Sequence, residues 1–401
     1  MQDRKAARAQ EYLNTLCSVQ PNRRTGSPGN REATDYVASI LSPWGYTMDT
    51  SPFECLDFES GEASLTIVNE VIALRVSPFT LPCDVRGKLV VASTIDELEA
   101  CTCDGKVLLM RGELCSEQLM PKNFVFYNPD RHKHIYSLLE AKQPAAIVTA
   151  TGENPDLVGA MYPFPLFEDG DFDIPSAYCT DIVGKRIAEH ANSKCKLAIQ
   201  ASRIPATASN VIAKKNVDAA RKVVVTAHID AYGTGPGASD DAAGVVAQIL
   251  LAEALRTYDG ALGIEIVSFN GEDYYSAGGQ MDYLRRYGSE MNRIAAAINI
   301  DDVGYIRGRT AYSFYECLDH ILMQTAEAFA SFAGLVEGPP WFQGDHMVFV
   351  QNKVPAMALT SELMPELMAS ITHTDKDTPD IVDCSKLVEI ASALEALILR
   401  L

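Results

Sequence analysis

The sequence predicts an α/β fold: a mixed, largely parallel sheet with helices on both faces, plus an inserted, mostly β domain. Two observations support this. Apolar β-branched segments alternate with helical patterns from about residue 206 onward, as expected for a sheet covered by helices. Residues 61–205 instead hold short apolar segments separated by Gly, Pro, Asp and Asn. We therefore predict one domain from residues 1–60 and 206–401, with residues 61–205 as the insert.

The elements are expected in the following order. Residues 5–18 and 31–42 have helical spacing and flank a turn-rich segment. The insert is expected to contain strands at 88–93, 106–111, 123–128 and 145–150 and a helix at 134–142. The segments 210–215 and 222–227 are expected to pair as a hairpin. Helices are then expected at 242–257, 276–287, 318–333 and 385–400, and strands at 263–269, 295–300 and 354–360.

Composition narrows the class of protein. The chain has 401 residues, 47% hydrophobic and 22% charged, which is typical of a globular protein with room for two domains. Its formal net charge of −19 disfavours nucleic acid and anionic membrane as partners, because both attract basic surfaces. The first 19 residues lack the unbroken apolar core of a secretion signal, and the ten cysteines are scattered. We expect a cytoplasmic protein with reduced thiols.

Acidic residues and histidines follow the predicted strands at the point where each strand ends. In open α/β sheets, ligands bind beyond the carboxyl ends of the strands, so these side chains should meet at one edge. Taken singly, each is commonly structural: a histidine at a strand end, or an acidic pair that caps a helix. Six such residues at successive strand and loop ends are hard to explain separately. They are His228, Asp240, Glu272, Asp273, Asp301 and His373.

Two histidines and three carboxylates form a suitable ligand set for a pair of zinc ions, and cobalt or manganese would accept the same ligands. One carboxylate would bridge the ions, which in such sites stand about 3.5–4 Å apart. The remaining glutamate, Glu272, would accept a proton from the water that the metal acidifies.

These residues resemble the motifs of the dizinc exopeptidases of peptidase family M28, which include bacterial leucine aminopeptidases, glutamate carboxypeptidases and, more distantly, glutaminyl cyclases. The resemblance covers about residues 1–60 and 206–401, and residues 24–30 (RTGSPGN) resemble the family's N-terminal segment. The matching motifs are His228-Ile229-Asp230, Gly237-Ala238-Ser239-Asp240-Asp241, Glu272-Asp273, Asn299-Ile300-Asp301, and His373-Thr374 before Asp377-Thr378.

The resemblance implies a role for each residue. Asp240 would bridge two zinc ions; His228 and Asp301 would complete one site, and Asp273 and His373 the other. Glu272 would be the general base, and Asp230 would fix the His228 imidazole. The Asp240–Asp241 peptide would be cis. Asp273 stands where the family often has Glu, and the cyclase branch binds a single zinc, so the number of ions stays open.

Two further segments resemble parts of that family. Residues 61–205 are more weakly similar to the protease-associated domain that some members carry as an insert, and a spacer domain without substrate contact is the alternative. Residues 339–349 correspond to a loop that borders the specificity pocket. Trp341 and Phe342 would line that pocket or anchor the loop.

We therefore expect a zinc-dependent exopeptidase, an aminopeptidase that acts on peptides or small amino-acid conjugates. A carboxypeptidase, deacylase or glutaminyl cyclase with the same metal site is the first rival, although no Arg or Lys cluster for a carboxylate is evident. A catalytically silent binding protein is the second, although it would be expected to have lost ligands. The sequence leaves the preferred side chain and any homo-oligomer open.

Overall fold

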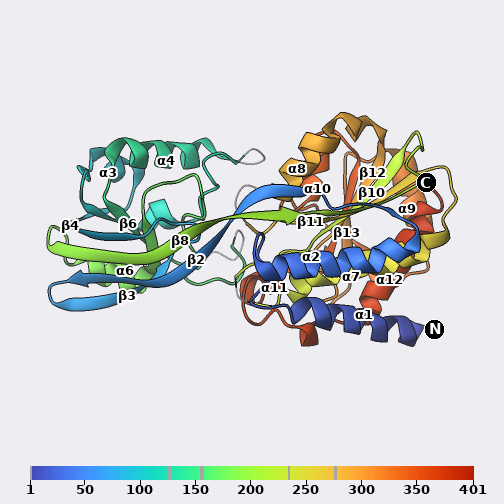
Figure 1. The fold of residues 1–401 in the computed structure, drawn as a ribbon, viewed down its shortest axis with the longest axis horizontal. Coiled ribbons are helices and arrows are strands. Elements are labelled where there is room, and N and C mark those ends of the chain that lie inside the picture. The colour runs from blue at the N-terminus through green and yellow to red at the C-terminus, as the bar shows by residue number, and fades with distance from the viewer. Residues whose placement is uncertain (1, 125–127, 154–157, 234, 275–277) are drawn as a thin grey trace. The chain divides into compact units, whose positions relative to one another are not determined.

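The structure is a computed structural model (Figure 1) that describes residues 2–124, 128–153, 158–233, 235–274 and 278–401. It divides the chain into two compact units. Unit 1 comprises residues 1–55, 207–367 and 371–401, and unit 2 comprises residues 56–206 with 368–370. Within the described ranges, no helix is both long and apolar enough to cross a membrane.

Unit 1 is built on an eight-stranded sheet in the order β1-β9-β11-β10-β12-β15-β13-β14. Its central strands β11, β10, β12 and β15 run parallel, and every residue in them is buried. Burial on both faces explains why these strands have nearly continuous apolar sequences. The strands are β1 (Thr47–Asp49), β9 (Val211–Lys215), β10 (Lys222–His228), β11 (Gly263–Phe269), β12 (Ile294–Ile300), β13 (Thr310–Tyr315), β14 (Leu335–Glu337) and β15 (Ala356–Ser361).

Helices cover both faces of this sheet, as predicted (Figure 1). Helix α7 is buried from Ala243 to Ala252. Its sequence is apolar on every face of the helix, which predicts this burial. The helices of unit 1 are α1 (Gln2–Cys17), α2 (Pro28–Leu41), α7 (Ala243–Ala254), α8 (Gly278–Tyr287), α9 (Asp319–Phe329), α10 (His346–Val350), α11 (Met364–Ser370, its end in unit 2) and α12 (Cys384–Ile398). Short 3-10 turns lie at Ser42–Trp44, Leu255–Thr257, Gly288–Arg293 and Pro379–Ile381.

Unit 2 is a closed sheet in the order β2-β3-β7-β6-β5-β4-β8. One apolar core lies among these strands and α6, and a second lies between the sheet and helices α3 and α4. The elements are β2 (Pro52–Ile67), β3 (Glu70–Val76), β4 (Cys83–Ala92), α3 (Ile95–Ala100), β5 (Val107–Met110), α4 (Asp130–Lys142), β6 (Ala146–Thr151), β7 (Ser176–Thr180), α6 (Asp181–Ala188) and β8 (Lys194–Ser209), with a 3-10 turn at Gly112–Cys115.

Two local predictions differ from the structure. The predicted hairpin of residues 210–215 with 222–227 is wrong: β9 pairs with β1 and β11, and β10 pairs with β11 and β12. Strand β11 lies between them and pairs antiparallel with β9 and parallel with β10. The predicted strand at 123–128 is also not formed where it is described, since Phe124 closes a turn onto Pro121; residues 125–127 lie outside the described ranges. Helix α8 begins at Gly278, and residues 276 and 277 of its predicted range lie outside the described residues.

Candidate metal centre

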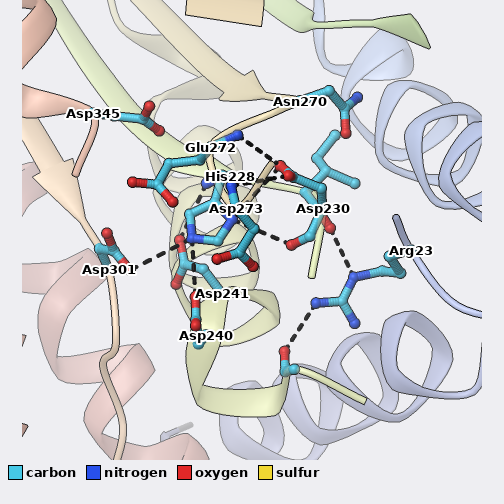
Figure 2. Close-up of polar contacts among 12 residues, drawn as sticks. Arg23, His228, Asp230, Asp240, Asp241, Asn270, Glu272, Asp273, Asp301 and Asp345 are labelled. Atoms are coloured by element: carbon cyan, nitrogen blue, oxygen red, sulfur yellow. Dashed lines mark hydrogen bonds and ion pairs between the residues drawn. The ribbon is translucent and has the colours of Figure 1, made fainter. Parts of the chain in front are cut away.

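The carboxyl ends of the parallel strands place the six predicted site residues around one point of unit 1. His228 is the last residue of β10, and Asp301 directly follows β12. Glu272 and Asp273 lie in the loop after β11, and Asp240 lies in a tight turn, Ala238–Ala242, between β10 and α7. His373 enters from the loop after α11 and has a left-handed backbone with φ 65°. Figure 2 shows this convergence, apart from His373.

Asp240 is the residue that both histidines contact. Its Oδ1 lies 3.1 Å from His228 Nε2, and its Oδ2 lies 3.1 Å from His373 Nε2. Each carboxylate oxygen therefore faces a different imidazole, which is the arrangement expected of a bridging ligand. The peptide between Asp240 and Asp241 is cis, as the resemblance implied.

The other two carboxylates divide between the histidines. Asp301 Oδ1 lies 3.6 Å from His228 Nε2, and Asp273 Oδ1 lies 3.0 Å from His373 Nε2. The His373 ring also stacks on Tyr232 at 4.8 Å between centroids, and Tyr232 stacks in turn on Tyr274 at 5.2 Å. The shorter Asp273 side chain thus still reaches the histidine with which the resemblance groups it.

Residues behind the centre orient these side chains. The backbone oxygen of Asp230 lies 3.2 Å from His228 Nδ1, whereas its carboxylate is 3.7 Å from that nitrogen. The Asp230 carboxylate instead accepts hydrogen bonds from the backbone N–H groups of Glu272 (3.4 Å) and Asp273 (3.2 Å). Asp230 thus contacts the imidazole mainly through its carbonyl, while its carboxylate positions the Glu272 loop.

The carboxylate of Asp241 bonds to backbone groups beside the centre. Its carboxylate accepts from the backbone N–H groups of His228 (3.2 Å) and Gly244 (2.9 Å). A side chain at Gly244 would meet this carboxylate at 2.3 Å, so the start of α7 requires glycine to approach so closely. Asp241 therefore joins the beginning of α7 to the end of β10.

The buried acidic groups of the centre require positive charge close to them. Burial raises the pKa of Asp273 to about 6, with a further increase from Asp240, and burial also raises the pKa of Glu272 well above its usual value. Burial lowers the pKa of His228 and His373, but the carboxylates around them outweigh it and raise both well above the ordinary value. So many acidic groups can share a buried site at neutral pH only if positive charge compensates them.

The donor set fits metal ions. Ligand atoms of His228, Asp240 and Asp273 lie within 4.8 Å of one another, and so do those of His228, Asp241 and Asp301. Among the described residues, the buried Asp273 Oδ2 has no hydrogen-bond partner. Imidazole nitrogens and carboxylate oxygens are the ligands that zinc takes in catalytic sites.

Three acidic residues around the centre were not predicted as functional. Asp377 accepts from the backbone N–H groups of Ser239 (2.7 Å) and Asp240 (3.1 Å), and Asp302 Oδ1 accepts from Ser239 Oγ at 3.3 Å. Asp345, 1% exposed, accepts from Gln280 Nε2 at 2.6 Å, and burial raises its pKa to about 7. Asp377 belongs to the motif that follows His373, and Asp345 lies in the 339–349 segment expected to border the pocket, but neither side chain was singled out.

The N-terminal residues 23–30, Arg23 and the RTGSPGN segment that follows it, hold the loops that carry the site. Arg23, 2% exposed, donates from its guanidinium to the carbonyls of Ile229 (2.7 Å), Pro236 (2.5 Å) and Gly237 (2.9 Å). All three carbonyls belong to the loop between His228 and Asp240. Arg23 thus holds in place the segment that connects His228 to Asp240.

The same segment also contacts the Glu272 loop. Ser27 caps α2 by accepting from Asn30 N at 3.0 Å, and the Asn30 side chain donates to the Arg23 carbonyl at 2.9 Å and to Asn270 Oδ1 at 2.5 Å. Asn270 lies two residues before Glu272. One short segment therefore joins two of the loops that build the centre.

We predict that Arg23→Met lowers the free energy of unfolding by about 3 kcal/mol or more, because it leaves several buried carbonyls without a donor. Urea unfolding of the apo and zinc-loaded forms would measure it. Arg31→Met is the matched control, since the exposed Arg31 donates to one carbonyl within the described part of the chain, that of Gly26 at 2.7 Å. Equal losses for the two variants would show that Arg23 does not hold the loop.

Comparison with solved structures defines the class of fold. The chain is similar to the aminopeptidase of Aneurinibacillus sp. strain AM-1 (TM-score 0.76, 19% identity, 98% of this chain and 93% of that one). It is also similar to BSAP, a zinc aminopeptidase of Bacillus subtilis (TM-score 0.73, 18% identity, 98% and 94%). This chain therefore has the fold of those enzymes, with a histidine and aspartate centre at its strand ends.

The sequence also matches a family model. Residues 210–398 match the model of peptidase family M28. The probable lipoprotein aminopeptidase LpqL of Mycobacterium tuberculosis is 23% identical over 292 residues, which are 70% of this chain and 54% of that protein. The chain spans about half the length of the curated relatives it matches.

Proposed function

We propose that the protein is a zinc-dependent aminopeptidase. The observation that carries the proposal is Asp240, whose two oxygens each face a different histidine at 3.1 Å. The relatives named above are aminopeptidases, and one is a zinc enzyme. We propose two zinc ions, one held by His228, Asp240 and Asp301 and the other by Asp240, Asp273 and His373.

Zinc at this centre would polarise the scissile carbonyl and acidify the attacking water. Glu272 accepts the proton of that water and returns it to the leaving amine, in the role of general base and then general acid. Burial raises the pKa of Glu272 well above its ordinary value, with a contribution from Asp301, and a higher pKa makes the carboxylate a stronger base. Asp230 holds the Glu272 backbone in place through the hydrogen bond described above.

The charge around the site favours a substrate with a free amino terminus. Carboxylates surround the centre, and burial raises the pKa of both Asp345 and Asp377 to about 7. Arg23, the cation whose contacts reach the site loop, donates to backbone carbonyls instead. An ammonium group suits the carboxylates around the centre.

A peptide pool tests this function. Each peptide is supplied with a free or an acetylated N-terminus and incubated with zinc-loaded protein, and mass spectrometry follows the products. We expect stepwise loss of N-terminal residues from the free forms only, abolished by a zinc chelator and restored by zinc. Trimming from the C-terminus, deacylation or cyclised N-terminal glutamine would replace this proposal with the corresponding activity. If no peptide is cleaved although the protein carries two zinc ions, the protein is better described as catalytically silent.

Two further proposals concern the rest of the molecule. Unit 2 is proposed to be a protease-associated-like domain, supported by the parallel strands β4, β5, β6 and β7 with α6 packed on them. A cytoplasmic location is proposed from the sequence, supported by ten cysteines that are all free thiols. Cell fractionation tests the cytoplasmic location, and recovery of the protein outside the cytoplasm would contradict this proposal.

A further inference from the structure

A second cavity in unit 1 lies at the opposite ends of the strands that carry the metal centre. It has a volume of about 230 Å³ and is lined by the end of β9, the first residue of β10 and the first residues of β11. Strand β10 runs from Lys222 at this cavity to His228 at the centre. The cavity is therefore separate from the metal ligands.

The lining of this cavity is positively charged. Four cationic side chains contribute to it, Lys214, Lys215, Lys222 and Arg293, against two carboxylates, Glu265 and Glu290. This is an excess of two positive charges in a chain whose formal net charge is −19. A local reversal of charge inside a concave site favours an anion.

Both carboxylates are already paired. Glu265, 3% exposed, accepts from Lys222 Nζ at 2.9 Å and from the Tyr283 hydroxyl. Glu290 accepts from Lys222 Nζ at 3.3 Å and from Arg293 Nη1 at 3.2 Å. These two acids therefore neutralise Lys222 and Arg293.

Lys214 makes no direct ion pair within the described residues, although the carboxylates of Glu265, Asp49 and Glu290 act on it from a distance. Among the residues that the structure describes, no hydrogen-bond acceptor contacts its Nζ, which lies 3.6 Å from the centroid of the Tyr287 ring. Neighbouring Lys215 donates to the Arg256 carbonyl, which carries no full charge. Burial lowers the pKa of Lys214, so its charge is held in a partly desolvated position. A bound anion would supply the missing partner.

We infer that this cavity binds a small oxyanion with two negative charges, with Lys214 as its principal partner. Two negative charges match the excess in the lining, and the volume holds an anion of this size together with a few waters. The shared chemistry is that of a dicarboxylate or a phosphate-like group. This inference does not depend on peptidase activity.

Calorimetric titration of the zinc-loaded protein with succinate, and separately with sulfate, tests the inference at constant ionic strength. We expect one site per chain for at least one of the two anions. Lys214→Gln should weaken that binding roughly tenfold or more, since it removes one charge-assisted hydrogen bond. Lys214→Arg should retain most of the affinity.

Lys353→Gln is the matched control, because it removes the same charge from an exposed lysine outside the cavity. Its affinity should equal that of the unaltered protein. Binding that is equally strong in Lys214→Gln and Lys353→Gln would place the anion elsewhere, the metal centre included, and would overturn the inference. Absence of saturable binding for both anions would overturn it as well.

Discussion

Glu272→Gln should lower kcat by roughly 10³-fold while the protein keeps its zinc. Glutamine preserves the size of the side chain but cannot accept a proton, and Glu272 is not among the residues that we assign as ligands. Figure 2 shows its carboxylate on the side of Asp301 and Asp345, and the hydrogen bond from its backbone to Asp230 does not involve the side chain. Kinetics on an N-terminal amide substrate and metal analysis of the same sample would measure both effects.

Glu11→Gln on the exposed face of α1 serves as the control for a lost carboxylate. The activity of Glu272→Asp should lie between those of Glu11→Gln and Glu272→Gln, because aspartate keeps the carboxylate but is shorter by one methylene. Loss of zinc in proportion to the loss of activity would instead make Glu272 a ligand. Unchanged activity would remove it from the mechanism.

Asp240→Asn should have a larger effect, because one substitution weakens both metal sites. We expect zinc content to fall from two ions per chain to less than one, and activity to fall by about 10⁴-fold or more. Asp301→Asn and Asp273→Asn should each weaken mainly one site, since each carboxylate contacts a single histidine. Zinc titration followed by calorimetry would separate the three variants.

Asp35→Asn, on the exposed side of α2, is the control for the loss of one aspartate charge. If Asp240→Asn loses no more zinc than Asp273→Asn, Asp240 does not bridge two ions. The test is independent of substrate choice, so it stands even if the preferred peptide is unknown.

The central sheet could be predicted because its strands are buried on both faces. The segments VVVTAH and GIEIVSF have few polar residues, and the residues that follow them must lie at one edge once the strands are parallel. Local sequence therefore located His228, Glu272 and Asp273. The Asp240 turn was located by its glycine-rich surroundings.

Strand partners could not be predicted in the same way. The segments 210–215 and 222–227 are adjacent in sequence, yet β11 lies between them, and only contacts across the sheet decide this order. The contacts of Arg23 could not be predicted from local sequence either. Arg23 contacts carbonyls more than 200 residues away, and a single polar residue in a loop gives no sign of which loop it will meet.

The contact of Asp377 with Ser239 and Asp240 has a consequence for biosynthesis. A nascent chain that has reached residue 301 already holds His228, Asp240, Glu272, Asp273 and Asp301. It still lacks His373, and the turn around Asp240 lacks the carboxylate that receives its two N–H groups. The complete centre can therefore assemble only after residues 373–377 have left the ribosome and folded back onto the part of the chain that carries the other ligands.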